Sequence, residues 1–169
     1  MGCSSIELTQ SLYQCQQLDW FELGRSDGVQ GRDSMGWKIR KDSCESFQSI
    51  HHESYVTGWY TGVDEFCSVP NAFVFGQTGQ KYRRICPQKK EAAFLLAYQQ
   101  GLKIYRFEKE NKEISEELRK LNLLTSTSAP QSLPPIIKKM NELETQLELN
   151  QALIAELQQE VGTATSVQK

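Results

Sequence analysis

The chain has 169 residues, and its 19 Lys and Arg residues against 21 Asp and Glu residues give a formal net charge of -2. That length corresponds to one domain, or to a small domain with an extension. The near-neutral balance argues against a dedicated nucleic-acid-binding protein, which usually carries a basic excess. No apolar run is long enough to span a membrane. The five cysteines leave one thiol over if the other four pair.

The chain begins Met-Gly-Cys, with no apolar signal segment before Cys3. Three interpretations are open. If Met1 is not native, Gly2 and Cys3 are the end of a bacterial lipoprotein cleavage site, and Cys3 is the lipidated first residue. Alternatively, Gly2 is myristoylated, although Ile6 stands where that signal has Ser or Thr. The third interpretation is an ordinary exposed terminus.

Composition divides the chain into four segments. Residues 1–14 are expected to be an anchor and linker, and residues 15–106, rich in Gly, Trp, Tyr and Cys, a compact helical module. Residues 107–161 contain no Gly or Cys and are expected to form a helical hairpin with its linker at 125–135, followed by a disordered tail at 162–169. The chain up to residue 106 carries a net charge of +1 and the remainder -3, so a weakly basic module carries an acidic helical arm.

Three helices are predicted in the module, at about residues 16–31, at 51–67 and from residue 88 onwards, directly after Pro87. The stretch between Cys67 and Cys86 contains Pro and Gly residues and is predicted to be a loop with little regular structure.

Pairs of glycines spaced four apart occur in two of these helices, which places both members of a pair on one helix face. Glycine lowers helix propensity by about 1 kcal/mol relative to alanine, so these positions need a reason. Such a face forms a groove that admits another backbone or a flat aromatic ring. The surrounding segments are similar at an offset of 34 residues, and a third partial copy hints at internal duplication. The positions concerned are Gly24, Gly28, Gly58 and Gly62, with Tyr98 and Gly101 repeating Tyr55 and Gly58.

Apolar residues recur at steps of three and four on both sides of the linker, which is typical of coiled-coil seams. Pro130, Pro134 and Pro135 are expected to stop a helix between them, and Gly162 is expected to cap the second helix. If the helices fold back antiparallel, Asn111 of one seam faces Asn150 of the other, and this pairing fixes the register. The alternative is a parallel homodimer in which Asn150 meets its own copy. We favour the hairpin.

The four cysteines of the module allow three pairings. We predict Cys67–Cys86, because closing that loop could stabilise the fold by about 3 kcal/mol, together with Cys15–Cys44. Disulfides indicate an oxidising compartment, such as the periplasm or the cell exterior.

The order of cysteines, aromatic residues and glycines resembles a bacterial family of lipoproteins that is defined only as domain of unknown function 2799. The resemblance covers roughly residues 15–105, and only the combined pattern is specific. It implies a lipoprotein signal ending in Gly-Cys, and therefore lipid attachment at Cys3. Ser4 follows the anchor instead of Asp, which implies sorting to the outer membrane. The family brings no known activity. The residues are Cys15, Trp20, Gly24, Asp27, Gly28, Gly31, Cys44, Tyr55, Gly58, Gly62, Cys67, Gly76, Gly79, Tyr82, Cys86, Pro87, Phe94, Tyr98 and Gly101.

Several residues are of types that bind metals, act as nucleophiles or bind phosphate, but a structural role explains them better. Cys44, His51, His52, Cys67 and Cys86 are zinc ligands by type but lack paired ligand spacing, so no metal is predicted. A catalytic cysteine would need a free thiol of lowered pKa. The sequence GQTGQK, at residues 76–81, lacks the spacing of a phosphate-binding loop and is read as a turn.

A basic stretch is the most promising surface. It could bind lipid phosphates, an acidic protein or an anionic glycan. The alternative is a solvated charged rim whose neighbouring aromatic residues form the core, and this alternative is favoured. The stretch and its aromatic neighbours comprise Lys81, Tyr82, Arg83, Arg84, Lys89, Lys90 and Trp59.

The sequence thus predicts an all-α protein, with a disulfide-stapled Gly-rich module followed by an antiparallel coiled-coil hairpin. We expect a lipoprotein on the periplasmic face of the outer membrane, with no cofactor and no enzymatic activity. Its partners would be the membrane, through the lipid, and an envelope protein, but not nucleic acid. The alternatives are a glycan or small-molecule binder that uses the glycine groove and the basic stretch and, less favoured, a zinc or thiol enzyme.

Overall fold

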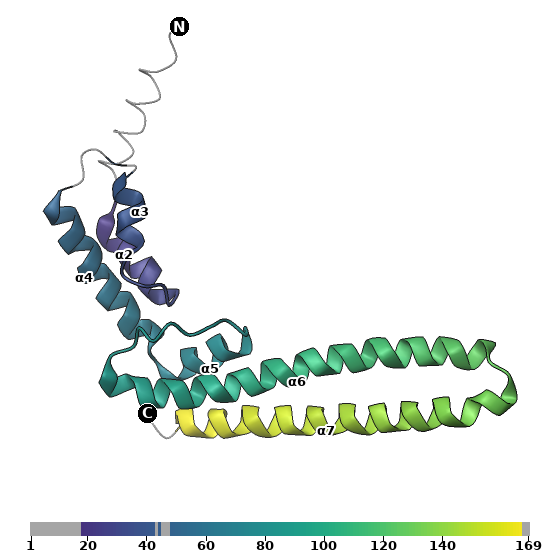
Figure 1. The fold of residues 1–169 in the computed structure, drawn as a ribbon. Helices are drawn as coiled ribbons and strands as arrows, with labels where there is room; N and C mark the ends of the chain where they lie inside the picture. Colours follow the sequence, from purple (N-terminus) through teal and green to yellow (C-terminus); the bar gives the residue numbers. More distant parts are fainter. Residues whose placement is uncertain (1–17, 43, 45–47, 167–169) are drawn as a thin grey trace, which may run out of the picture. The chain divides into compact units, whose positions relative to one another are not determined.

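The computed structural model describes residues 18–42, 44 and 48–166. Within these ranges the chain is helical and has no strand, which confirms the all-α prediction. None of the described helices is both long and apolar enough to cross a membrane. The helices are α2 (Trp20–Val29), α3 (Gly36–Asp42), α4 (Ser49–Phe66), α5 (Val69–Gln77), α6 (Gln88–Thr127) and α7 (Leu133–Ser166), with a 3-10 turn at Pro130–Ser132 (Figure 1).

The chain divides into two compact units. The first comprises the chain up to Asn71 together with Lys81–Phe94, and the second comprises Ala72–Gln80 together with the chain from Leu95 onwards. The composition boundary near residue 106 lies inside α6, which continues through it without a break. The domain division drawn from composition stays a prediction.

Local signals explain where α2 begins and why α5 was missed. The Asp19 side chain caps α2 by accepting a hydrogen bond of 3.0 Å from the backbone N–H of Glu22. The prediction of an irregular loop between Cys67 and Cys86 is wrong, because α5 occupies Val69–Gln77. Pro70 lies in the first turn of α5, where its missing N–H needs no partner.

In the first unit, α2 and α4 are in direct backbone contact. A Cβ atom on Gly24 would overlap the carbonyl of Tyr55, and one on Gly58 would overlap the carbonyl of Phe21. One turn further along both helices, Gly28 meets the Trp59 carbonyl in the same way, so the two helices run parallel. The groove predicted from the glycine spacing therefore holds a second backbone and is not open to a ligand.

The second unit repeats this contact between α5 and α6. A Cβ atom on Gly76 would overlap the Tyr98 carbonyl, and one on Gly101 would overlap the Phe73 carbonyl. In both units each of these glycines meets the carbonyl of an aromatic residue that lies three positions before the opposing glycine. The internal similarity in the sequence thus corresponds to one packing contact that is used twice.

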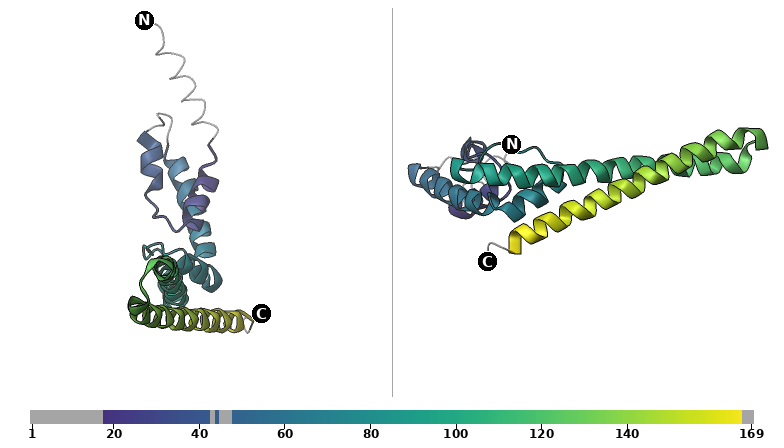
Figure 2. Two further views of the ribbon diagram at one scale, coloured as in Figure 1. Left: turned by 90° about the vertical axis from the view of Figure 1, so that its right-hand side faces the viewer. Right: turned by 90° about the horizontal axis from the view of Figure 1, so that it is seen from below.

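Helices α6 and α7 lie side by side and antiparallel (Figures 1 and 2). The fully buried Asn150 donates from Nδ2 to Oδ1 of Asn111 at 2.9 Å, and its own Oδ1 accepts from Gln146 Nε2 at 2.9 Å. Lys139 pairs with Glu117 across the helices at 3.9 Å. The two asparagines therefore meet within one chain, while the coiled-coil form of the seam stays a prediction.

The predicted break between the two helices is present, because α6 ends at Thr127 and α7 begins at Leu133. Pro134 and Pro135 lie in the first turn of α7, where proline is tolerated. The prediction of a helix end at Gly162 is wrong, because α7 continues to Ser166. Residues 162–166 of the expected disordered tail are therefore helical, and residues 167–169 lie outside the described residues.

We expect Gly58→Ala to lower the free energy of unfolding by about 3 kcal/mol or more, because the added methyl group forces α2 and α4 apart. Helix propensity alone would make the same substitution stabilising by about 0.5–1 kcal/mol, so the sign distinguishes the two effects. Urea unfolding followed by circular dichroism measures the change. Thr61→Ala, at an exposed position of α4, is the matched control, and equal stability of the two variants would contradict the backbone contact.

We expect Asn150→Leu to cost about 1–3 kcal/mol, because the amide of Asn111 loses its buried partner. Replacing both asparagines by leucine should recover most of that loss. A double-mutant cycle from urea unfolding measures the coupling, and Asn141→Leu, at an exposed position of α7, is the control. Additive single and double changes would show that the two amides do not interact.

Candidate functional site

A buried carboxylate is the polar centre of the first unit. Asp27 lies on α2 beside Gly28 and is only 2% exposed. Its Oδ2 accepts hydrogen bonds from the Tyr55 hydroxyl at 2.6 Å and from Arg40 Nη1 at 2.8 Å. Its Oδ1 accepts from Arg32 Nη1 at 3.0 Å and from Arg40 Nη2 at 3.3 Å. We call these four residues the Asp27 cluster.

Three segments bring the Asp27 cluster together. Tyr55 comes from α4, which packs directly on α2, and Arg40 comes from α3. Arg32 follows α2, and its backbone is held by two hydrogen bonds, from its N–H to the Asp27 carbonyl at 3.0 Å and from Trp59 Nε1 to its own carbonyl at 2.9 Å. The cluster is therefore fixed at the backbone as well as at the side chains.

Gly36, the first residue of α3, makes room for these side chains. A Cβ atom there would lie 2.6 Å from Oδ2 of Asp27 and 2.7 Å from the Tyr55 hydroxyl. The Gly36 carbonyl also accepts a hydrogen bond from Arg40 Nη1 at 3.0 Å. The start of α3 thus closes over the carboxylate without a side chain of its own.

The cluster is charged but not poised for proton transfer. Burial raises the pKa of Asp27, but hydrogen bonds from Tyr55 and Arg40 and the charge of Arg40 outweigh it, so the pKa lies below its ordinary value. Burial and the hydrogen bond to Asp27 raise the pKa of Tyr55 well above its usual range. At neutral pH Asp27 is ionised and Tyr55 is protonated.

A groove of about 710 Å³ opens beside the cluster. Asp27 and two arginines of the cluster form part of its wall, and Arg83, which pairs with Asp33 at 3.6 Å, forms another part. All these residues belong to the first unit. The complete lining is Asp27, Arg32, Asp33, Met35, Gly36, Lys38, Ile39, Arg40 and Arg83.

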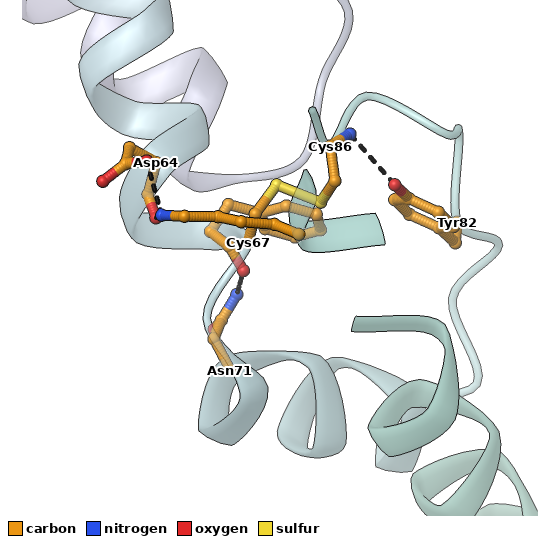
Figure 3. Close-up of a disulfide and its surroundings, with 7 residues drawn as sticks. Asp64, Cys67, Asn71, Tyr82 and Cys86 are labelled. Carbon is orange, nitrogen blue, oxygen red and sulfur yellow. Dashed lines mark hydrogen bonds and ion pairs between the residues drawn. A yellow bond between two sulfur atoms is a disulfide. The ribbon is translucent and has the colours of Figure 1, made fainter. Parts of the chain in front are cut away.

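The predicted Cys67–Cys86 disulfide is confirmed (Figure 3). Both cysteines are buried, and the side chain of Asn71 donates to the Phe66 carbonyl at 2.8 Å just beyond the end of α4. Cys44 is also buried and disulfide-bonded. Its predicted partner, Cys15, and the proposed lipid attachment site, Cys3, lie outside the described residues.

The basic stretch does not form a single cluster with its aromatic neighbours. Trp59 and Tyr82 are buried, and the Tyr82 ring lies 4.6 Å from that of Phe94 between ring centroids. The Tyr82 hydroxyl accepts a hydrogen bond from the backbone N–H of Cys86 at 2.9 Å (Figure 3). These contacts fit the interpretation in which the aromatic residues form the core.

The cations of the stretch are distributed over different surroundings. Lys90 forms an ion pair with the Asp64 carboxylate, whereas Arg83 lines the groove beside the Asp27 cluster. Lys81, Arg84 and Lys89 are exposed. Whether the stretch binds a partner stays a prediction.

The histidines considered as zinc ligands have other contacts. His51 stacks on Trp20 with ring centroids 5.7 Å apart, and its Nδ1 accepts from the backbone N–H of Gln48 at 3.0 Å. His52 lies edge-on to Trp37. No group of three metal-ligating side chains occurs in the part of the chain that the structure describes.

In the sequence, Asp27 stands out as a member of the family pattern, and Tyr55 as a member of that pattern and of the internal repeat, whereas Arg32 and Arg40 were missed. The available signal was the position of Asp27 next to Gly28 on a helix face that is packed against another backbone. A carboxylate on such a face needs a charged partner. The sequence around it supplies arginines but does not show which of them fold back.

Residues 19–103, about half of the chain, match the sequence model described as "Protein of unknown function (DUF2799)". The chain belongs to this family. The DUF2799 region contains both glycine contacts and the whole Asp27 cluster, and it ends inside α6, before most of the hairpin. The predicted family is therefore confirmed, while its lipoprotein character in this chain stays a prediction. No curated protein and no solved structure matches the chain.

We expect Tyr55→Phe to lower the free energy of unfolding at pH 7 by about 1.5–3 kcal/mol, because Asp27 loses a charge-assisted hydrogen bond. The lowered pKa of Asp27 contributes stability above the unfolded-state pKa of about 4, and this contribution is lost as the pH falls through the lower folded-state value. Without the Tyr55 hydroxyl that pKa rises toward normal. The difference between the two proteins should therefore shrink toward about pH 2.

Urea unfolding at several pH values measures this difference. Tyr60→Phe removes the hydroxyl of an exposed tyrosine on the same helix and should change stability by less than about 0.5 kcal/mol. A wild-type advantage over Tyr55→Phe that is equal at pH 7 and at about pH 2 would contradict the assigned role of Asp27.

Proposed function

We propose that this DUF2799 protein is a lipid-anchored protein on the periplasmic face of the outer membrane, and that it acts as a structural or protein-interaction module. The observation that carries the proposal is the disulfide bonding of Cys44, Cys67 and Cys86. Disulfides persist in oxidising compartments and are rare in the cytosol. The anchor at Cys3 and the outer-membrane location rest on the sequence resemblance.

A binding role is favoured over catalysis by the state of the buried polar groups. Asp27 accepts four hydrogen bonds, and the pKa of Tyr55 is raised away from neutrality, so neither exchanges a proton easily near pH 7. The disulfide-bonded cysteines have no free thiol with which to act as nucleophiles or zinc ligands.

The hairpin offers the surface for a protein partner. Leu123, which is 69% exposed, and Leu124 lie in the last turns of α6, and the exposed Ile137 lies near the start of α7. All three residues are close in sequence to the turn between α6 and α7, and a region of exposed apolar side chains is a candidate for protein interaction. The closed end of the hairpin is therefore the segment that we assign to an envelope protein partner, with the lipid holding the chain at the membrane.

The alternative function, binding of a glycan or small molecule, needs a site other than the glycine groove and the aromatic residues beside the basic stretch. The glycine groove is filled by backbone in both units, and Trp59 and Tyr82 are buried. The groove beside the Asp27 cluster is open to such a ligand.

We expect a photocrosslinking amino acid at Leu124 to form an adduct with an envelope protein in intact bacterial cells. The same probe at Glu116, an exposed position on the same helix, should give none, and Leu123→Glu should reduce the adduct at Leu124 because it places a charge in an apolar contact. The readout is the mobility of the tagged chain on a denaturing gel. Equal crosslinking at positions 124 and 116 would contradict a specific contact at the hairpin end.

Cell fractionation in the same experiment tests the anchor. The chain, produced behind a lipoprotein signal segment, should sediment with membranes and incorporate labelled palmitate. Cys3→Ser should release it to the soluble periplasmic fraction, whereas Ser4→Ala should not. Membrane association that is unchanged in Cys3→Ser would contradict lipid anchoring at this residue.

A further inference from the structure

We propose that the groove beside the Asp27 cluster is a binding site for a phosphate monoester, held by Arg32, Arg40 and Arg83. Neither the family nor the role proposed above assigns a ligand to this groove. The inference rests on the charges, the unused hydrogen-bond donors and the apolar residues of the groove wall.

The charges of the groove wall do not balance. Four cationic side chains line it against two carboxylates, Asp27 and Asp33, which leaves a surplus of two positive charges. Within the Asp27 cluster one buried carboxylate faces two guanidinium groups. A phosphate monoester carries about -1.5 to -2 charges at neutral pH and therefore matches this surplus better than a single carboxylate does.

The arginines present donors that the protein does not use. Among the described residues, Arg32 donates a hydrogen bond only through Nη1, to Asp27, and its side chain is 55% exposed. Its Nη2 and Nε groups therefore remain for a ligand. Arg83 makes one long ion pair of 3.6 Å with Asp33 and is 60% exposed. Guanidinium groups bind phosphate oxygens in pairs of parallel hydrogen bonds.

Asp27 acts here as a positioning residue. It holds Arg40 through both Nη1 and Nη2 and Arg32 through Nη1, so the two guanidinium groups are oriented before any ligand arrives. Because Asp27 is nearly fully buried, it orients the arginines while presenting little negative charge to solvent. Preorganisation of this kind lowers the entropy that binding must overcome.

The same groove has an apolar side. Met35 and Ile39 line it, and Ile39 is 79% exposed, although it is a large apolar residue on a short helix. An alkyl group attached to the phosphate would cover these side chains. The groove is therefore matched to an organic phosphate monoester in preference to inorganic phosphate.

The test is calorimetric titration of the full chain with hexyl phosphate, inorganic phosphate and hexanoate. We expect saturable binding of hexyl phosphate, with weaker binding of the other two compounds. Arg32→Gln should weaken the binding of hexyl phosphate at least about tenfold, because a charge-assisted hydrogen bond is lost. Lys81→Gln removes an exposed cation outside the groove and should change the affinity less than about twofold.

A second variant keeps the test decisive if Arg32→Gln unfolds the Asp27 cluster. Arg83→Gln removes only the long pair with Asp33, and it too should weaken binding severalfold while the circular dichroism spectrum stays unchanged. The proposal is overturned if hexyl phosphate does not bind saturably. It is also overturned if both groove variants bind as the wild type does, or if Lys81→Gln loses as much affinity as they do.

Vesicles distinguish a lipid headgroup from a free ester as the source of the phosphate. Phosphatidic acid carries a phosphate monoester, whereas phosphatidylglycerol carries a diester. Each is placed at the same mole fraction in phosphatidylcholine vesicles. If the ligand is a lipid, the chain should bind the vesicles with phosphatidic acid more tightly, and this preference should depend on Arg32. Binding of hexyl phosphate without such a preference indicates a soluble ester. The binding measurements use the purified chain without an anchor. They can therefore fail while the crosslinking at Leu124 succeeds, or succeed while the crosslinking fails, so the two proposals are tested separately.

Discussion

The close approach of α2 and α4 is the constraint on which the first unit depends. Gly24 and Gly58 have no side chain, so each helix rests on backbone carbonyls of the other. Tyr55 takes part twice, because its carbonyl contacts Gly24 while its hydroxyl reaches Asp27 one turn further along α2. Asp27 is thereby buried between the helices, and a buried carboxylate must be paired. Arg40 meets that requirement from α3 and Arg32 from the segment that follows α2, so these ion pairs tie both segments to the contact between α2 and α4.

The stability of the fold does not by itself explain why two arginines, Arg32 and Arg40, pair with the single carboxylate of Asp27. Replacing a buried ionic group by apolar residues of similar volume is often neutral or stabilising, since the desolvation penalty rivals the attraction. One guanidinium would also have been enough to neutralise Asp27. The second arginine adds a positive charge that no described side chain of the cluster cancels. Arg32 donates to Asp27 through Nη1 alone, and its side chain lines the groove. The arrangement is better explained by what it presents to a ligand than by what it adds to folding.

Features that repeat along a helix could be predicted from the sequence, whereas the side-chain contacts of Asp27 could not. The spacing of Gly24 and Gly28 placed both on one face, and the apolar steps around Asn111 and Asn150 indicated a fold-back in which the two meet. Helix α5 was missed because Pro70 and the nearby glycines suggest a turn, although proline in a first helical turn and glycine at a helix contact are both compatible with a helix. The partners of Asp27 lie 5, 13 and 28 residues away, at separations that no helical period predicts.

The continuity of α6 explains why a change of composition near residue 106 produces no break in the fold. Between Gly101 and Pro130 the sequence has neither glycine nor proline, so the helix continues past the family region that ends at residue 103. Residues before that point are constrained by the backbone contact at Gly76 and Gly101, whereas residues beyond it need only keep the pairing with α7. The groove residues lie between positions 27 and 83, and the exposed apolar residues of the hairpin end lie between positions 123 and 137. Because the two sets share no residue and belong to different compact units, substitutions at the hairpin end need not alter the arginines of the groove.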